Sequence, residues 1–295
     1  TKSISTLGPR RADWGGGAYG SGASVTFTNC DFLSNRCTWA GGGAYFENSS
    51  ASVQECRFQG NSGIGCGPDP YGGGIACDYA VLSLNGCSFV DNSALGAAAI
   101  YCNTYSALSV TGSLFAGNED SGHFTYGGAI TCDQNSTGAL FDCTIVGNRN
   151  GGLFASSHSR VSLTGCTIAG NQSGRGGGLV AWLDSSFELE RCILWGNCAT
   201  IAGDNLYLRT TDCRASFACC CVDSTGIDGV SGYAQPTWLE GNIFSDPAFC
   251  DAASCQSAPT TAGDYQLWNY SPCVQVRCGQ IGAHGIGCWN PQDVA

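Results

Sequence analysis

The chain has 295 residues, 43% of them apolar and 12% charged, which is enough apolar material for a sizeable core and too little charge for a disordered chain. Its net charge of −11 argues against nucleic acid or an anionic membrane surface as a partner. No run approaches the roughly 18 consecutive apolar residues of a membrane helix, so we expect no membrane span.

The 21 cysteines indicate an oxidising compartment and a disulfide framework, with buried free thiols as the alternative. No pair of CxxC knuckles occurs and histidine appears three times, so we predict no zinc site. Methionine is absent and the chain begins at Thr1. We therefore expect that a leader was removed and that the protein is secreted to the extracellular space or the cell surface.

A glycine-rich opening recurs along the chain from Gly15 onward, and each copy is followed by a cysteine and, five residues later, an asparagine. Ser113 replaces the cysteine in one copy, and successive asparagines lie 23 to 31 residues apart. Repetition at such a period is typical of solenoids. The positions that we predict to form stacked ladders are Cys30, Cys56, Cys87, Cys143, Cys166 and Cys192, with Asn35, Asn61, Asn92, Asn118, Asn148, Asn171 and Asn197.

Apolar and polar residues alternate within each copy, and this period of two predicts strands with one buried face rather than helices. Two residues after the cysteine, four copies carry an aromatic ring that we predict to stack inside, at Phe32, Phe58, Phe89 and Phe115. We expect the glycines at corners that need positive φ or close backbone approach. We expect the asparagines at another corner, bonded to neighbouring backbone and in left-handed geometry.

A repeat this short cannot bury its own apolar face, but parallel copies stacked at about 4.8 Å can. We therefore predict an all-β fold, a right-handed parallel β-helix (solenoid) of about seven to eight rungs over residues 14–200. Residues 1–13 would be an N-terminal extension and residues 201–295 a cysteine-rich C-terminal cap. A propeller is the alternative, although its blades are longer and antiparallel.

Stacked rungs bring equivalent Cα atoms within disulfide range, so Cys30–Cys56, Cys143–Cys166 and Cys77–Cys102 are candidate bridges. Side chains in register point the same way, however, and free stacked thiols remain the alternative. In the tail, crosslinks would replace missing hydrophobic burial. The candidate disulfide cysteines are Cys77, Cys102, Cys213, Cys219, Cys220, Cys221, Cys250, Cys255, Cys273, Cys278 and Cys288.

Cys77 and Cys102 belong to a second column of equivalent positions. The residues directly after this column in successive copies are Glu47, Asp78, Asn103 and Asp133. They would line one outer face and could hold Ca²⁺ or a sugar. A solvated polar face is the alternative. No cluster of Arg or Lys accompanies these acids, and nothing marks the acid pair of a glycosidase, a Ser-His-Asp order, a P-loop or a metalloprotease helix. We predict no catalytic residue and no cofactor.

Two further groups of surface residues are candidate sites. Outward aromatic residues could form a binding stripe for sugar or protein, at Tyr19, Tyr45, Tyr101, Trp39, Trp195 and Trp268. Sequons for N-glycosylation occur at Asn48, Asn135, Asn171 and Asn269.

The repeat resembles the GGA[ILV] and FxxN repeats of chlamydial polymorphic outer-membrane proteins and related bacterial β-helix surface proteins. The matching segments include Gly128-Ala129-Ile130 and Phe32-Leu33-Ser34-Asn35, and the resemblance covers roughly residues 14–200. The tail, with Asp246-Pro247-Ala248-Phe249-Cys250, is similar to the closing segment of secreted bacterial right-handed β-helix repeat proteins. The resemblance implies an architecture and lends no specific activity.

These observations favour an extracellular structural protein, a self-assembling filament or sheath subunit. Residues 1–13 carry Lys2, Arg10 and Arg11 against one acid, whereas the region after residue 199 is acidic. Ends of opposite sign favour head-to-tail contact and a homopolymer. A carbohydrate-binding adhesin is the second interpretation, and a polysaccharide-degrading enzyme is the third.

Overall fold

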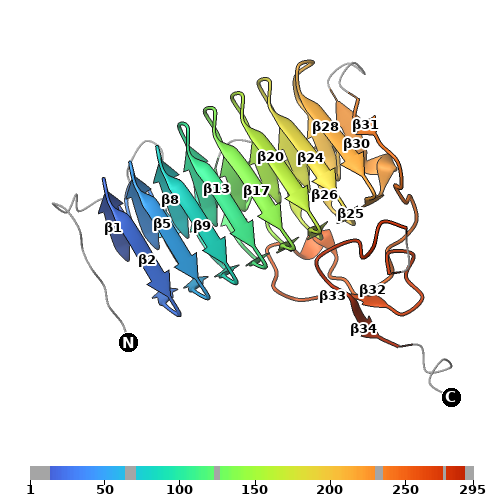
Figure 1. Ribbon diagram of the computed structural model, residues 1–295, viewed down its shortest axis with the longest axis horizontal. Coiled ribbons are helices and arrows are strands. Elements are labelled where there is room, and N and C mark those ends of the chain that lie inside the picture. The colour runs from blue at the N-terminus through green and yellow to red at the C-terminus, as the bar shows by residue number, and fades with distance from the viewer. Residues whose placement is uncertain (1–13, 64–70, 123–126, 230–234, 275–276, 290–295) are drawn as a thin grey trace.

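The computed structural model describes residues 14–63, 71–122, 127–229, 235–274 and 277–289. Parallel rungs stack along the length of the molecule, and three sheets run along the stack (Figure 1). Within these ranges, helix is confined to two short 3₁₀ turns, Ser224–Gly226 and Cys255–Ser257. The predicted all-β parallel β-helix is therefore confirmed. The described part of the chain holds no helix of the length and apolarity that crossing a bilayer requires.

Successive rungs give one strand to each of three long sheets, except that the last described rung has none in the third. The first sheet consists of β1 (Ala18–Ser21), β4 (Ala44–Glu47), β8 (Ile75–Asp78), β12 (Ile100–Asn103), β16 (Ile130–Cys132), β19 (Leu153–Ala155), β23 (Leu179–Ala181), β27 (Leu206–Leu208) and β30 (Ile227–Gly229). The second sheet consists of β2 (Ser24–Thr28), β5 (Ser50–Gln54), β9 (Val81–Asn85), β13 (Ala107–Thr111), β17 (Thr137–Phe141), β20 (Arg160–Thr164), β24 (Ser186–Glu190), β28 (Arg214–Ala218) and β31 (Thr237–Trp238). The third sheet consists of β3 (Asp31–Leu33), β6 (Arg57–Gln59), β10 (Ser88–Val90), β14 (Leu114–Ala116), β18 (Thr144–Val146), β21 (Thr167–Ala169), β25 (Ile193–Trp195) and β29 (Cys221–Val222).

Shorter strands complete the structure. At one corner, short ladders are formed by β7 (Ser62–Gly63), β11 (Ser93–Ala94) and β15 (Glu119–Asp120), and by β22 (Gln172–Arg175) and β26 (Cys198–Ala202). The tail contributes a separate sheet of β32 (Phe249–Asp251), β33 (Asp264–Trp268) and β34 (Ile286–Cys288).

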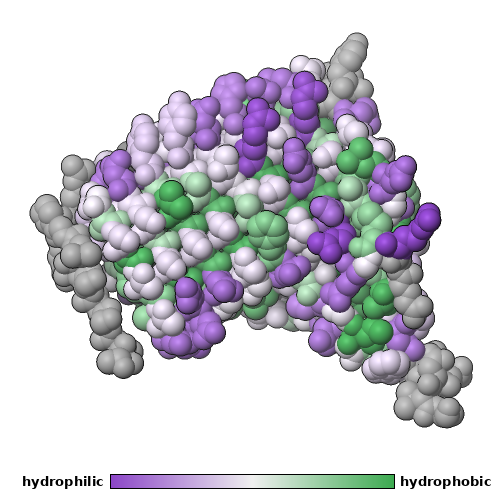
Figure 2. All heavy atoms as spheres, viewed as in Figure 1, coloured by the Kyte–Doolittle hydropathy of each residue, from purple (hydrophilic) through white to green (hydrophobic). Residues whose placement is uncertain are grey.

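The second sheet shows the predicted alternation most clearly. In β5, Ala51 and Val53 are buried, while Ser50 and Gln54 are exposed. β9 repeats the pattern in register, with Val53 beside Leu84. The strands of this sheet cross the face turned to the viewer, and that face is largely pale in Figure 2 because its outward residues are mostly small and hydroxylic.

The predicted aromatic column is also present in the core. The ring centroids of Phe32 and Phe58 lie 4.4 Å apart, with planes 2° from parallel. The stack continues to Phe89 at 4.7 Å and to Phe115 at 5.0 Å. Like residues therefore lie directly over one another, as expected of a solenoid whose rungs share one register.

The repeated asparagines form one continuous hydrogen-bonded ladder inside the corner that follows the third sheet. Each side-chain amide donates to the carboxamide oxygen of the next asparagine at 2.9–3.0 Å, from Asn35 to Asn205. Asn92 shows the remaining bonds: its Nδ2 also donates to the carbonyl of Phe58, and its backbone N–H donates to Oδ1 of Asn118. These amides are buried yet saturated with partners, so their burial carries little penalty.

One prediction about this corner is wrong. The asparagines do not adopt left-handed geometry; the residue before each asparagine from Asn35 to Asn197 does, with φ of 52° at Ser34, 63° at Gly60 and 64° at Gly117. The asparagine side chain must point inward along the ladder, and the chain therefore reverses one residue earlier.

The glycine runs lie where the backbones of two rungs meet closely, as predicted. A Cβ atom on Gly42 would lie 2.4 Å from the carbonyl oxygen of Gly73, and one on Gly43 would lie 2.6 Å from that of Gly74. Gly41 has a φ of 70°, which favours glycine for a second reason.

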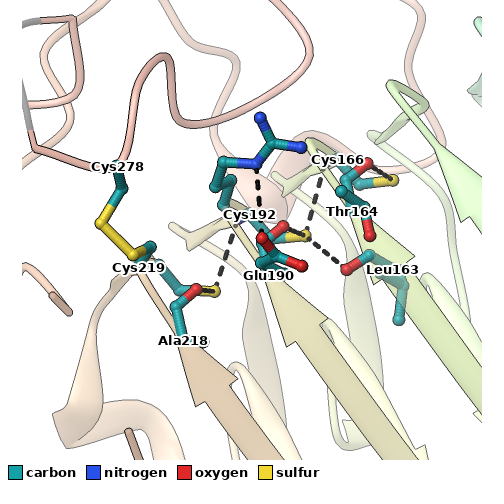
Figure 3. A network of polar contacts seen from close by, with 10 residues as sticks. Leu163, Thr164, Cys166, Glu190, Cys192, Ala218, Cys219 and Cys278 are labelled. Atoms are coloured by element: carbon teal, nitrogen blue, oxygen red, sulfur yellow. Dashed lines mark hydrogen bonds and ion pairs between the residues drawn. A yellow bond between two sulfur atoms is a disulfide. The ribbon is translucent and has the colours of Figure 1, made fainter. Parts of the chain in front are cut away.

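The first cysteine column is present but is not crosslinked, and Cys220 extends it. Cys192 is representative: its Sγ donates to the carbonyls of Glu190 and Leu163 at 3.3 and 3.4 Å and accepts the N–H of Cys166 at 3.4 Å (Figure 3). The candidate bridges Cys30–Cys56 and Cys143–Cys166 are therefore absent, because these side chains point the same way and bond to backbone. The thiols behave as small core residues. The free thiols of this column are Cys30, Cys56, Cys87, Cys143, Cys166, Cys192 and Cys220.

The second cysteine column is likewise reduced. Cys77 and Cys102 are register partners whose Sγ atoms lie 2.8 Å apart as a hydrogen-bonded pair of thiols, not as the candidate disulfide.

The stack continues beyond the predicted boundary at residue 200, since β27, β28 and β29 form a further rung. The chain then reverses, and the tail lies beside the third sheet rather than only across its end (Figure 1). Tyr265 packs on Ala116, Val146 and Ala169, and the carbonyl of Ala258 accepts the Arg149 guanidinium.

Disulfides fasten this tail to the stack. Cys198–Cys255 and Cys219–Cys278 each join a rung to the tail, and Cys250–Cys288 closes the tail on itself. Five of the candidate tail cysteines are thus bonded as predicted, whereas Cys198 was not among the candidates. Four candidates remain free and buried, at Cys213, Cys220, Cys221 and Cys273. Cys221 and Cys273 belong to an apolar cluster with Leu267 and Ile281, where they act as apolar side chains.

The aromatic column predicts a large cost for its truncation. Phe89 is fully buried between two stacked rings, so Phe89→Ala should lower the free energy of unfolding by about 3–5 kcal/mol in urea denaturation. Phe141→Ala, which removes a ring that is 41% exposed on the second sheet, should change it by less than about 0.5 kcal/mol. Equal effects of the two variants would contradict the stacked core.

The tail disulfides predict a second stability effect. Cys219 and Cys278 close a loop with a sequence separation of 59, and the Cys219→Ser/Cys278→Ser variant should lose about 2–4 kcal/mol of stability. Cys30→Ser, at a partly exposed free thiol, is the matched control. Recovery of alkylated Cys219 and Cys278 from unreduced protein by mass spectrometry would overturn the assignment.

Candidate functional site

Two adjoining cavities lie on the outer face of the first sheet and share Tyr71 and Tyr101; we call them together the groove. The larger cavity has a volume of about 380 Å³ and the smaller about 220 Å³. The larger is lined by Tyr71, Leu95, Gly96, Ala97, Tyr101, Asp120, Gly122, Gly127, Thr131, Asp133, Phe154, Ser156, Ser157, Trp182 and Leu183. The smaller is lined by Trp14, Trp39, Ala40, Tyr45, Tyr71, Ala76, Cys77, Asp78, Tyr101 and Asn103.

One column of outward residues forms the floor of the groove. Tyr45, Ala76, Tyr101, Thr131 and Phe154 are successive register partners on β4, β8, β12, β16 and β19. Parallel pairing places them about 4.8 Å apart along the stack. The floor therefore runs along the axis of the molecule across five rungs.

Rings from the corner before the first sheet form one wall. Trp14 lies 4.5 Å from Tyr45 between centroids, and Tyr71 stacks on Tyr101 at 4.4 Å. Trp39 stacks on Trp14 at 5.9 Å and keeps 39% of its surface exposed. The mutual stacking holds these rings in place, so the groove is largely formed in the absence of a ligand.

Phe154 and Trp182 form the far end of the groove. Their centroids lie 6.5 Å apart with planes 23° from parallel, and both rings are half-buried. The guanidinium of Arg209 lies 3.7 Å from the centroid of Trp182, a cation–π contact that orients this ring.

Three polar atoms in the groove are buried without a hydrogen-bond partner. They are Oδ1 of Asp78, Oδ1 of Asn103 and Oγ1 of Thr131, a residue that is only 4% exposed. An unsatisfied buried polar atom costs about 1–3 kcal/mol. Their clustering along one groove is the polar feature of this site that calls for an explanation.

Two more carboxylates line the larger cavity, in different surroundings. Asp133 accepts the Tyr101 hydroxyl at 3.5 Å and the Gln134 N–H at 2.8 Å. Burial raises the pKa of Asp120 to about 6, while the N–H groups of Gly122 and Ala97, at 2.9 and 3.2 Å, oppose this shift. Asp120 therefore braces the corner backbone, and Asp133 is the more available acid.

The predicted acid column is thus partly confirmed as a feature of one face. Asp78, Asn103 and Asp133 line the groove, whereas Glu47 lies beside it and accepts the hydroxyls of Tyr19 and Ser21 at 3.1 and 3.3 Å. In the described ranges, no three His, Cys, Asp or Glu side chains gather as ligands for a metal ion, so the Ca²⁺ alternative finds no ligand set there.

The predicted aromatic stripe divides between two places. Tyr45, Tyr101 and Trp39 line the groove, and Tyr19 stacks on Tyr45 at 5.8 Å. Trp195 and Trp268 instead line a separate hollow of about 710 Å³ beside the tail.

The sequence analysis did not single out Tyr71, Asp120, Thr131, Phe154 or Trp182. Thr131 and Phe154 occupy the same column as Tyr45 and Tyr101, so the repeat alignment held the signal for them. Tyr71 and Asp120 flank variable insertions, whose course the repeat does not specify.

The four sequons fall in different environments. Asn48 and Asn135 are exposed at turns and Asn269 is half-buried, so these three stay predictions. Asn171 is fully buried and is bonded to Asn148, Asn197 and the carbonyl of Ile145. A glycan has no access to that side chain, and the prediction at Asn171 is wrong.

A scan against known protein families matched the right-handed β-helix region over residues 12–137 and 123–265. The chain belongs to this family, which agrees with the observed stack. No curated protein and no solved structure gives a significant match. The family is one whose architecture is compatible with structural, adhesive or polysaccharide-degrading roles, and the choice among them depends on the groove.

Proposed function

We propose that this protein is an extracellular carbohydrate-binding protein that holds an extended saccharide in the groove. The observation that carries the proposal is the combination of aromatic rings and unsatisfied polar atoms in one preformed groove. Sugar rings have apolar faces that pack on aromatic rings and hydroxyl groups that need hydrogen-bond partners. Such a site therefore fits a saccharide better than a purely apolar or a purely charged ligand.

The shape of the groove supports a chain rather than a single sugar. The two cavities share Tyr71 and Tyr101 and follow the stack axis, so one ligand could contact rings from Trp39 to Trp182. The three disulfides support an extracellular setting, where saccharide chains of this kind occur.

The filament interpretation depends on Lys2, Arg10 and Arg11, which lie outside the described residues. Head-to-tail assembly therefore stays a prediction. Carbohydrate binding requires no such assembly, and a monomeric rod suffices for it.

Aromatic truncation tests the proposal. On an array of neutral, amino and acidic oligosaccharides, the native chain should bind at least one class. Phe154→Ala and Trp39→Ala should each weaken that binding about fivefold, the equivalent of about 1 kcal/mol for one ring contact.

Phe141→Ala is the matched control because it removes an exposed ring from the second sheet, outside the groove. Its affinity should equal that of the native chain. Binding that survives both groove substitutions unchanged, or a native chain that binds no oligosaccharide, would contradict the proposed function.

A further inference from the structure

The charge of the groove has one sign. Its described lining includes three aspartates, Asp78, Asp120 and Asp133, and no lysine, arginine or histidine. Arg209 contacts Trp182 at the far end without lining either cavity. The whole chain carries a net charge of −11, so long-range attraction also favours a cationic ligand over an anionic one.

The polar atoms without hydrogen-bond partners also favour a ligand with positive charge. Oδ1 of Asp78 is a pure acceptor, buried with no donor beside it in the described structure. Oδ1 of Asn103, its register partner on the next rung, also lacks a donor. A ligand that satisfies both must donate, and an ammonium group donates while it neutralises the carboxylate.

The rings provide a second reason. Tyr71, stacked on the buried Tyr101, and Trp39 at one end present π systems beside Asp78. Aromatic faces attract cations within about 6 Å of the ring centroid, and a carboxylate nearby strengthens the site for an ammonium group. A neutral saccharide would keep ring packing and neutral hydrogen bonds but would lack the charge-assisted contact.

The distance between the two aspartates along the stack favours a polymeric ligand. Asp78 and Asp133 project from positions two rungs apart, a separation of about 10 Å for parallel strands. This is comparable with the length of a disaccharide in an extended chain. One chain with an amine on each sugar could therefore meet both carboxylates at once.

We infer that the groove selects a polymer of amino sugars whose free, protonated amines contact Asp78 and Asp133. The inference rests on the proposed function and narrows its ligand to a cationic saccharide. Acidic polysaccharides are disfavoured because their carboxylates would meet those of the groove without a countercharge.

The test measures the binding of three oligosaccharides of equal length by titration calorimetry at low salt and mildly acidic pH. The first is an oligomer of β-1,4-linked glucosamine. The second is its N-acetylated counterpart, and the third is an oligogalacturonate. The glucosamine oligomer should bind at least about tenfold more tightly than the N-acetylated one, and the oligogalacturonate most weakly. Added salt should reduce the first affinity far more than the second.

Asp78→Asn/Asp133→Asn should remove the preference for the free amine, so that the glucosamine oligomer binds no more tightly than the N-acetylated one. Glu188→Gln/Asp251→Asn is the matched control, because it removes two exposed charges outside the groove and should retain the preference. Thermal melts of both variants check that the fold is kept.

The outcomes separate the inference from the function on which it rests. Equal binding of the amine and N-acetylated forms, or a preference that survives Asp78→Asn/Asp133→Asn, overturns the inference and leaves carbohydrate binding standing. Failure of all three saccharides to bind overturns both. Tighter binding of an oligolysine peptide than of the glucosamine oligomer would show that the groove takes a basic protein segment instead.

Discussion

The structure depends on a single register that every rung shares with the next. The asparagine ladder enforces it, because each side-chain amide donates to the carboxamide of the next rung and to a backbone carbonyl of the preceding rung. A rung displaced by one residue would leave these buried amides without partners, at a cost of about 1–3 kcal/mol for each. The close approach at Gly42 and Gly43 is possible only in the same register, since any side chain there would meet a carbonyl.

This shared register explains how a repetitive stack of strands forms a groove on one outer face. Inward positions are repeated from rung to rung, so they form columns of Phe, Cys and Asn that hold the stack together. Outward positions are free to vary, and whatever one column presents becomes a continuous feature along the axis. The column from Tyr45 to Phe154 presents aromatic rings, and the neighbouring column from Asp78 to Asp133 presents oxygen atoms that accept hydrogen bonds. The groove results from placing these two columns side by side.

The repeated part of this structure was predictable from the sequence, and the unrepeated part was not. Alternation and a fixed offset between Cys and Asn were sufficient for the parallel stack, the Phe32–Phe115 column and the ladder, because each is a local pattern copied many times. The tail has no copies, so its path beside the third sheet and the pairing of Cys198 with Cys255 depend on contacts that no repeat reveals. The outward column at Tyr45 and Tyr101 was predicted as a stripe, but the unsatisfied oxygens at Asp78 and Thr131 emerge only from three-dimensional packing. The bridge proposed for Cys30 and Cys56 failed because spacing alone does not give the direction of a side chain.

The central claim is that the outer face of the first sheet holds a saccharide along the stack axis. A crystal structure of the protein soaked with a β-1,4-linked glucosamine tetramer tests it most directly. The account predicts a chain that crosses Tyr71 and Tyr101, with an amine in hydrogen-bond contact with the carboxylate of Asp78. A tetramer bound instead in the hollow beside Trp195 and Trp268, or a chain lying across the rungs, would contradict it.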